Sequence, residues 1–351
     1  MRIEQLTFTR FLAAISIVIF HYGQKSFLFN NKFVDFIVEK ADVCVSYFFI
    51  LSGFVMMIAY ANKTAISSKE YLINRLARIY PVYFLAILIM LFVQIRLHAI
   101  DYIGLLCNIF MIQAWIPGKI SSINPPGWSL SVEILFYLIF PFIFNKCFRK
   151  IRLEKLIIYI VLFWILSQII FQTLWFIYLK NDSQILDDLM NSPLLRINEF
   201  LIGNLAGFLY TEKLKFKNGN YDFLIILFIS FIILALKFSM NLNFHNGLLA
   251  VFFIPLIILI SLNNGLITKL FQNRSLVFLG EISFGIYILQ HPVFSVISAY
   301  SVKKYLHMTD VTMVFFLRLI LLIIAASVSY LYIEKPIQNL IKTRRVKLTR
   351  V

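Results

Sequence analysis

The chain has 351 residues, of which 60% are apolar and only 14% are charged. A soluble domain carries about 25% charged residues, and a water-soluble fold of this size could not bury so much apolar surface. Disordered and collagen-like classes are excluded as well, because Gly and Pro are few. We therefore expect an all-α fold, a polytopic integral membrane helix bundle that forms a single transmembrane domain over residues 1–351.

The net charge of +16 allows two interpretations. A basic balance can indicate nucleic-acid binding, but no hydrophilic segment is long enough to form such a module, so we expect none. In a membrane protein, the excess Lys and Arg lie in cytoplasmic loops. The cysteines Cys44, Cys107 and Cys147 have no metal-ligand spacing and predict neither a zinc site nor a disulfide framework.

Membrane spans are predicted from the apolar runs, because a helix needs about 20 mostly apolar residues to cross a hydrocarbon core. Eleven runs are candidates: 6–22, 43–60, 79–95, 100–116, 130–144, 156–179, 197–211, 221–239, 247–262, 276–298 and 312–333. The first contains Arg10 and no cleavage pattern follows it, so we interpret it as a retained span and not a signal peptide.

The placement of Lys and Arg predicts which runs cross. With a cytoplasmic N-terminus and no full crossing at 100–116, the cytoplasmic side holds 21 of the 33 Lys and Arg, and the outer side holds ten, among them Arg196. If 100–116 crossed the membrane fully, the basic cluster at 146–155 and the basic tail at 335–351 would face outward. The positive-inside rule thus predicts about ten transmembrane helices with both termini cytoplasmic.

The segment 100–129 is then expected to re-enter the membrane or to lie on its outer surface. Irregular backbone at membrane depth is tolerated only where it is buried in protein or lines a wet cavity. The turn-forming stretches Pro117-Gly118 and Pro125-Pro126-Gly127 fit such a broken element.

Ionisable residues inside the apolar runs are candidates for function, because a charge at mid-bilayer costs at least about 2.5–3.5 kcal/mol. There are seven: Arg10, His21, Glu133, Glu199, Glu281, His291 and Arg318. We expect them to pair, to face a polar interior or to line a substrate path. Arg10 and His21 are eleven residues apart on the first span, which places them near one face and about 16 Å apart.

Several of these positions allow a structural as well as a functional interpretation. His21 is either a general base, acyl carrier or relay, or a structural histidine bonded to a backbone carbonyl. Arg75 and Arg78 share a helix face, where they suit phosphate oxygens or simply anchor the topology. Glu133 is either a buried partner for Arg or His, or part of a capping-box-like helix start.

A polar stripe is predicted on the late span, where Ser283, Tyr287 and His291 follow one another at four-residue intervals. Such a stripe forms interhelical hydrogen bonds or lines a reaction cavity.

These features together resemble the membrane acyltransferase-3 family over residues from Phe8 to about Lys335. Five motifs carry the resemblance: Arg10-x10-His21, Phe48-Phe49-Ile50-Leu51-Ser52-Gly53-Phe54, Arg75-x-x-Arg78 with Tyr80-Pro81, Trp128-Ser129-Leu130-Ser131-Val132-Glu133, and the segment from Gly280 to His291-Pro292. Two positions depart from the family pattern: Cys44-Val45-Ser46-Tyr47 replaces Gly-Val-Asp, and Gln290 stands where Leu or Val is common.

The resemblance implies an O-acyltransferase of the bacterial plasma membrane. It would transfer an acyl group, usually acetyl, from acetyl-CoA to a hydroxyl of a lipid-linked or surface polysaccharide, with acyl-CoA, a glycan acceptor and membrane lipid as partners. Catalytic roles are expected for His21, Arg10 and Glu133, with Arg10 as a candidate stabiliser of the oxyanion and Glu133 as partner of His21 or Arg10. Donor phosphates are expected at Arg75 and Arg78. Six further residues are expected to contact substrate: Ser52, Trp128, Ser131, Glu281, Tyr287 and His291.

Two other functions stay open. A transporter or flippase is also a charged, kinked bundle, but carriers commonly contain inverted repeats and none is visible here. Acylation of an amino sugar, a macrolide-like molecule or a lipid is the other alternative.

Overall fold

The computed structural model describes residues 3–178, 183–215 and 217–348. In these ranges the chain is helical and has no β-strand beyond an isolated bridge between Gly219 and Asn263. The predicted all-α membrane bundle is therefore confirmed. The part of the basic tail at 349–351 lies outside the described residues.

The α-helices follow in chain order: α1 (Gln5–Val18), α2 (Asp35–Val38), α3 (Val43–Tyr60), α4 (Ser68–Arg96), α5 (Tyr102–Ile109), α6 (Trp128–Ile143), α7 (Leu153–Tyr178), α8 (Ser183–Met190), α9 (Pro193–Leu209), α10 (Asp222–Lys237), α11 (Ala250–Leu262), α12 (Leu266–Phe271), α13 (Arg274–Glu281), α14 (Ser283–Val296), α15 (Ala299–Leu306), α16 (Val311–Ser329) and α17 (Lys335–Leu348). Short 3-10 helices are η2 (Gln113–Trp115) and η3 (Pro125–Gly127). π-Helical turns are η1 (Ile19–Gly23), η4 (Phe144–Phe148), η5 (Tyr210–Leu214) and η6 (Tyr330–Glu334).

Six helical segments are long and apolar enough to cross a membrane: Gln5–Gly23, Val43–Tyr60, Ser68–Arg96, Pro125–Phe148, Leu153–Tyr178 and Val311–Ile341. A seventh is formed if α13 and α14, which meet at a 53° bend, act as one span. The predicted run at 276–298 is thus two helices. These segments establish a polytopic membrane protein, while the count of about ten spans stays a prediction.

Three other predicted spans form helices that are shorter than a full crossing. α9, α10 and α11 have 17, 16 and 13 residues, and at 1.5 Å per residue the last is about 20 Å long against a core of about 30 Å. α9 is prolonged by the turn η5.

The run at 100–116 does not form one helix. Its α5 has eight residues, about 12 Å in length, and it is followed by a loop and η2. Asp101 caps α5 by accepting the Gly104 N–H at 2.9 Å, and it also pairs with Lys119 at 2.9 Å. These two contacts hold the pKa of Asp101 below its usual value. The pair with Lys119 also connects the start of α5 to the loop that follows η2.

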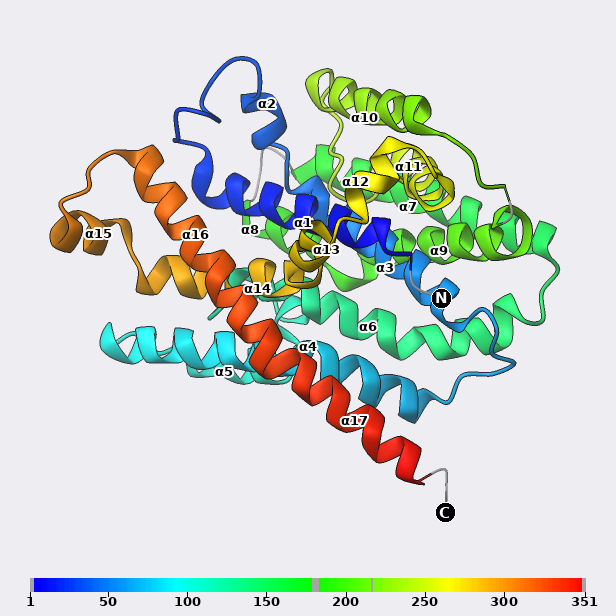
Figure 1. Ribbon diagram of the computed structural model, residues 1–351, viewed down its shortest axis with the longest axis horizontal. Coiled ribbons are helices and arrows are strands. Elements are labelled where there is room, and N and C mark those ends of the chain that lie inside the picture. The colour runs from blue at the N-terminus through cyan, green and yellow to red at the C-terminus, as the bar shows by residue number, and fades with distance from the viewer. Residues whose placement is uncertain (1–2, 179–182, 216, 349–351) are drawn as a thin grey trace.

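The helix α1 lies inside the bundle, packed against α3, α11, α13 and α14. It begins at the same end of the bundle at which α17 ends, and this end is called the N-terminal end below (Figure 1). The opposite end carries α2, α5 and α15 (Figure 1). Because Arg10 lies midway along α1 and His21 in η1, the two are displaced along this direction.

The most extensive helix pair, α3 with α9, is held together by glycines. A Cβ at Gly203 would lie 2.1 Å from the Ile50 carbonyl oxygen, and one at Gly53 would lie 2.3 Å from that of Phe200. Without side chains at these positions the backbones approach closely, which is the usual way in which membrane helices associate. This contact fixes the frame against which the other helices pack.

Replacement of Gly203 by Leu is therefore expected to destabilise the bundle by about 1–3 kcal/mol or more, because the added side chain meets backbone and not a movable side chain. The measurement is the thermal midpoint for loss of monodisperse elution in detergent. The control is Gly219→Ala, where the added Cβ would lie 3.3 Å from the Tyr221 ring. An unchanged midpoint for Gly203→Leu would contradict the close α3–α9 contact.

Candidate active site

A central cavity of about 110 Å³ lies between α1, α3, α4, α6 and α14. The polar side chains in its lining are Arg10, Ser52, Arg75, Arg78, Ser129, Glu133, Tyr137, Ser283 and Tyr287. Three guanidinium groups face one carboxylate, so the lining carries excess positive charge. In an apolar bundle such an excess favours an anionic ligand.

The α4 arginines enter this cavity from one helix face. Arg75 and Arg78 are three residues apart, as the sequence predicts, and both are half-buried. The Arg75 guanidinium lies over the rings of Tyr71 at 5.3 Å and Tyr60 at 6.0 Å. Its buried Nε has no hydrogen-bond partner among the described residues. A buried N–H without an acceptor is a free donor for a ligand oxygen.

Glu133 faces the arginines from α6. Its Oε2 accepts a hydrogen bond from the Tyr137 hydroxyl at 3.2 Å. The charges of Arg10, Arg78 and Arg75 act on the carboxylate. Of the two predicted partners of Glu133, the structure brings Arg10 into the same cavity and keeps His21 out of it.

A second cavity, of about 260 Å³, adjoins the first and shares Arg10 and Arg78 with it. It reaches toward the N-terminal end, where Ile3 and Gln338 line it. Glu281 lies in this second cavity, whereas Ser283 and Tyr287 of the same motif line the central one. The two cavities together lead from the N-terminal end of the bundle to the central arginines.

His21 lies beyond the central cavity, in the π-helical turn η1. Its Nδ1 is 2.8 Å from the Gln290 Oε1, and its side chain is exposed. π-Helical turns are frequent at functional sites, because the extra residue redirects a side chain. The link to the cavity runs along α14: Tyr287 lines the cavity, and Gln290 follows three residues later, about 4.5 Å along the helix axis.

His291 does not join the polar stripe in the cavity. Its Nδ1 is 3.1 Å from the Tyr22 hydroxyl. Two adjacent residues of α14, Gln290 and His291, therefore contact His21 and Tyr22 respectively. The predicted stripe is thereby divided: Ser283 and Tyr287 face the cavity, and His291 contacts η1.

Ser131 and Trp128 lie next to the cavity and not in its lining. The Ser131 hydroxyl accepts the Ala114 N–H at 3.3 Å and is fully buried, which attaches η2 to α6. The Trp128 ring lies 5.3 Å from the Arg196 guanidinium. In these positions both residues support the cavity wall.

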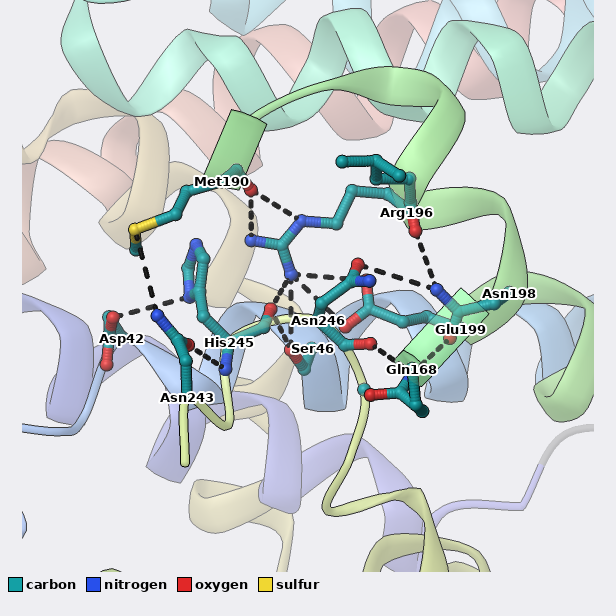
Figure 2. Close-up of polar contacts among 12 residues, drawn as sticks. Asp42, Ser46, Gln168, Met190, Arg196, Asn198, Glu199, Asn243, His245 and Asn246 are labelled. Carbon is teal, nitrogen blue, oxygen red and sulfur yellow. Dashed lines mark hydrogen bonds and ion pairs between the residues drawn. The ribbon is translucent and has the colours of Figure 1, made fainter. Parts of the chain in front are cut away.

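Figure 2 shows the buried polar cluster around Arg196 and Glu199. The guanidinium of Arg196 pairs with Glu199 at 3.2 Å, and both side chains are 0% exposed. Arg196 also donates to the backbone carbonyls of Met190, at 2.7 Å and 3.0 Å, and of His245. Arg196, expected in an outer loop, thus lies inside the first turns of α9, because Glu199 and the carbonyls compensate its charge.

Two residues of the site escape sequence reasoning. Tyr137, four residues after Glu133, has the spacing that brings two side chains together on a helix, and that spacing could have indicated it. Gln290 departs from the family pattern, but no local rule predicts its partner. Its 0% exposure and its contact with His21 become visible only in three dimensions.

Comparisons with known proteins find relatives that include named acyltransferases. The acyltransferase MdmB of Streptomyces mycarofaciens is 30% identical over 44% of this chain and 42% of its own length. The protein of Staphylococcus aureus strain COL named "Putative O-acetyltransferase SACOL0978" is 25% identical over 94% of this chain and 56% of its own length. The exopolysaccharide production protein ExoZ of Rhizobium meliloti is 32% identical over 27% of this chain and 32% of its own length.

The chain thus matches about half or less of the length of these relatives. No solved structure matches it. Residues 3–334 match the family described as the acyltransferase domain. Since this match covers nearly the whole chain, the chain belongs to the acyltransferase-3 family, as the motifs indicated.

Proposed function

We propose that the chain is a membrane O-acyltransferase that transfers an acetyl group from acetyl-CoA to a hydroxyl of a lipid-linked or surface polysaccharide. It would act in the bacterial plasma membrane, with both termini in the cytoplasm. The observation that carries the proposal is the arrangement on α1, where Arg10 shares a cavity with two further arginines and His21 lies three turns beyond, held by Gln290.

The donor is assigned to the N-terminal end of the bundle. Acyl-CoA carries phosphates at one end and a thioester at the other, joined by the long pantetheine arm. Planar guanidinium groups bind phosphate oxygens well, and Arg75 has a buried Nε without an acceptor in the described part of the chain. The phosphates would contact Arg75 and Arg78, and the arm would extend past Tyr287 toward His21.

The acceptor side of the reaction is assigned to His21, whose tautomer follows from its partner. The Gln290 amide donates its N–H to the Tyr287 carbonyl at 2.7 Å, so its oxygen is turned toward His21. An amide oxygen only accepts, and therefore the Nδ1 of His21 carries the proton. The Nε2 then has a free lone pair and is the nitrogen that can act as a base.

The transfer itself requires one proton relay. As the acceptor oxygen bonds to the thioester carbonyl carbon, its proton moves to Nε2 of His21. The carbon–sulfur bond then breaks, and the imidazolium returns the proton to the coenzyme A thiolate. Arg10 lies about 16 Å from His21 along α1, so we assign it to the donor's binding cavity and not to the oxyanion, with Glu133 balancing its charge.

His21→Ala is expected to lower acetyl transfer by about 10²–10⁴-fold, the usual contribution of a general base. The assay supplies membranes with radiolabelled acetyl-CoA and fractionated polysaccharide, and it counts label in the glycan. His307→Asn, at an exposed histidine of the loop after α15, is the control. Full activity of His21→Ala at equal protein level would remove His21 from the reaction.

Gln290→Leu is expected to lower kcat about tenfold while KM for acetyl-CoA stays unchanged, because one hydrogen bond that orients the imidazole is lost. Nitrogen-15 NMR of labelled histidine, with the His21 signals assigned by their loss in His21→Ala, should show a tautomer mixture in place of the Nδ1–H form. Gln290→Glu should retain that form, since a carboxylate also accepts from Nδ1. An Nδ1–H signal unaffected by Gln290→Leu would show that the glutamine does not set the tautomer.

Arg78→Gln is expected to raise KM for acetyl-CoA about tenfold, the effect of losing one charge-assisted hydrogen bond to phosphate. The discrimination against a donor without its 3′-phosphate should weaken as well. Arg96→Gln, at the far end of the same helix, is the matched control. Equal KM values for the two variants would contradict donor binding at Arg78.

A further inference from the structure

A third cavity lies at the end of the bundle opposite the N-terminal end, and the proposed donor site does not include it. It measures about 280 Å³, near the lower end of the roughly 300–1,000 Å³ of small-molecule sites. Its polar and aromatic lining consists of Tyr22, Tyr300, Lys303, Thr309, Phe315 and Arg318. Tyr22 directly follows His21, and the two rings are 5.9 Å apart. The cavity therefore reaches the residue next to the proposed base, while His21 itself is outside its lining.

Arg318 gives this cavity an uncompensated positive charge. It lies in the apolar helix α16, where an arginine is costly unless it is paired. It donates one hydrogen bond, from Nη2 to the Phe294 carbonyl at 2.6 Å. Its buried Nε has no hydrogen-bond partner, and no ion pair of Arg318 exists within the described ranges. Four of its five N–H donors thus stay available to a ligand.

Lys303 adds a second cation from α15. Its side chain is exposed and lines the same cavity, whereas the neighbouring Lys304 does not. Two cations without a carboxylate in the lining favour an anion that binds both.

The rings of Tyr22, Tyr300 and Phe315 supply the remaining wall. Phe294 is outside the lining but contacts two of the lining side chains. The Arg318 guanidinium stacks on Phe294 at 4.1 Å, and the Tyr22 ring stacks on the same Phe294, also at 4.1 Å. Tyr300 is 72% exposed at the rim. Aromatic faces with a polar edge are suited to a ring that is apolar on its faces and polar at its edge, as a sugar is.

We propose that this cavity, here named the acceptor cavity and formed around Tyr22, Lys303 and Arg318, binds an anionic glycan acceptor through a carboxylate or phosphate group. The inference rests on the proposed function and narrows its substrate class. The anion would sit between Lys303 and Arg318, and the sugar would lie along Tyr22 with a hydroxyl directed toward His21.

The test measures binding without any acetyl donor, so that its outcome is independent of catalysis. The purified full chain in phosphatidylcholine nanodiscs is titrated with a fluorescent tetrasaccharide of galacturonic acid and with a neutral tetrasaccharide of glucose. A third arm incorporates a polyprenyl phosphate in the nanodisc and measures its retention. The first arm reports a sugar carboxylate and the third reports the phosphate of a lipid carrier.

Lys303→Gln is expected to weaken binding of the anionic probe about fivefold, since a single exposed charge contributes up to about 1 kcal/mol. Arg318→Lys, which keeps the charge and loses the planar fork, should weaken it about tenfold. Lys304→Gln removes the same charge from the same helix outside the cavity and should have no effect.

Binding of either anionic probe that depends on Lys303 and not on Lys304 supports the acceptor cavity and identifies the source of the anion. Equal binding of the neutral probe, equal effects of the two lysine variants, or no binding of either anionic probe would overturn it. Acetyl transfer to neutral glycans alone would overturn this inference and leave the proposed function intact. Binding of an anionic probe without any acetyl transfer would support the acceptor cavity and contradict the proposed function.

Discussion

The structure depends on one constraint, which is that a charge inside an apolar bundle must have a partner or a ligand. The buried charges of this chain meet the constraint in three ways. Arg196 is fully compensated by Glu199 and backbone carbonyls, and it has no role open to a ligand. Glu133 is held by Tyr137 among arginines. Arg75 and Arg318 each retain a buried Nε with no acceptor in the described residues, and these two mark the cavities that we assign to substrates.

The cavities that we assign to donor and acceptor lie at different levels along the segment formed by α1 and η1. Arg10 lines the cavities that reach the N-terminal end, and Tyr22 lines the one at the opposite end. α14 runs beside α1 and holds η1 through Gln290 and His291. Donor and acceptor would therefore approach the imidazole from different ends of the bundle. Under the proposed function, such a layout would let a cytosolic thioester modify a glycan on the other side of the membrane.

The sequence was informative where a local rule applies. Helical spacing predicts that Arg75 and Arg78 share a face and that Ser283 and Tyr287 share another, and both pairs line the central cavity. Composition predicts the membrane bundle, because no soluble fold buries so much apolar surface. The placement of Lys and Arg predicts that 100–116 does not cross as a full helix, and this segment consists of a short α5, a loop and η2.

The sequence is less informative where the outcome depends on packing between distant segments. Arg196 looked like a loop charge, since nothing local reveals that Glu199 and the carbonyl of His245 compensate it. The sequence allows His21 as well as Arg10 as the partner of Glu133, because all three are ionisable residues in apolar runs. Their separation follows from the length of α1, whose axial rise of 1.5 Å per residue puts Arg10 and not His21 at the level of the cavity.

The π-helical turn that ends α1 makes the site sensitive to chain length. Its wider turn holds one residue more than an α-helical turn, and His21 and Tyr22 both lie within it. Loss of a single residue in this stretch would restore α-helical winding, and the side chains within the turn would then point in other directions. The imidazole would then swing off Gln290, and the tyrosine would leave Phe294. Single side chains around this turn can be exchanged independently, whereas a shorter turn would change the contacts of His21 and Tyr22 together.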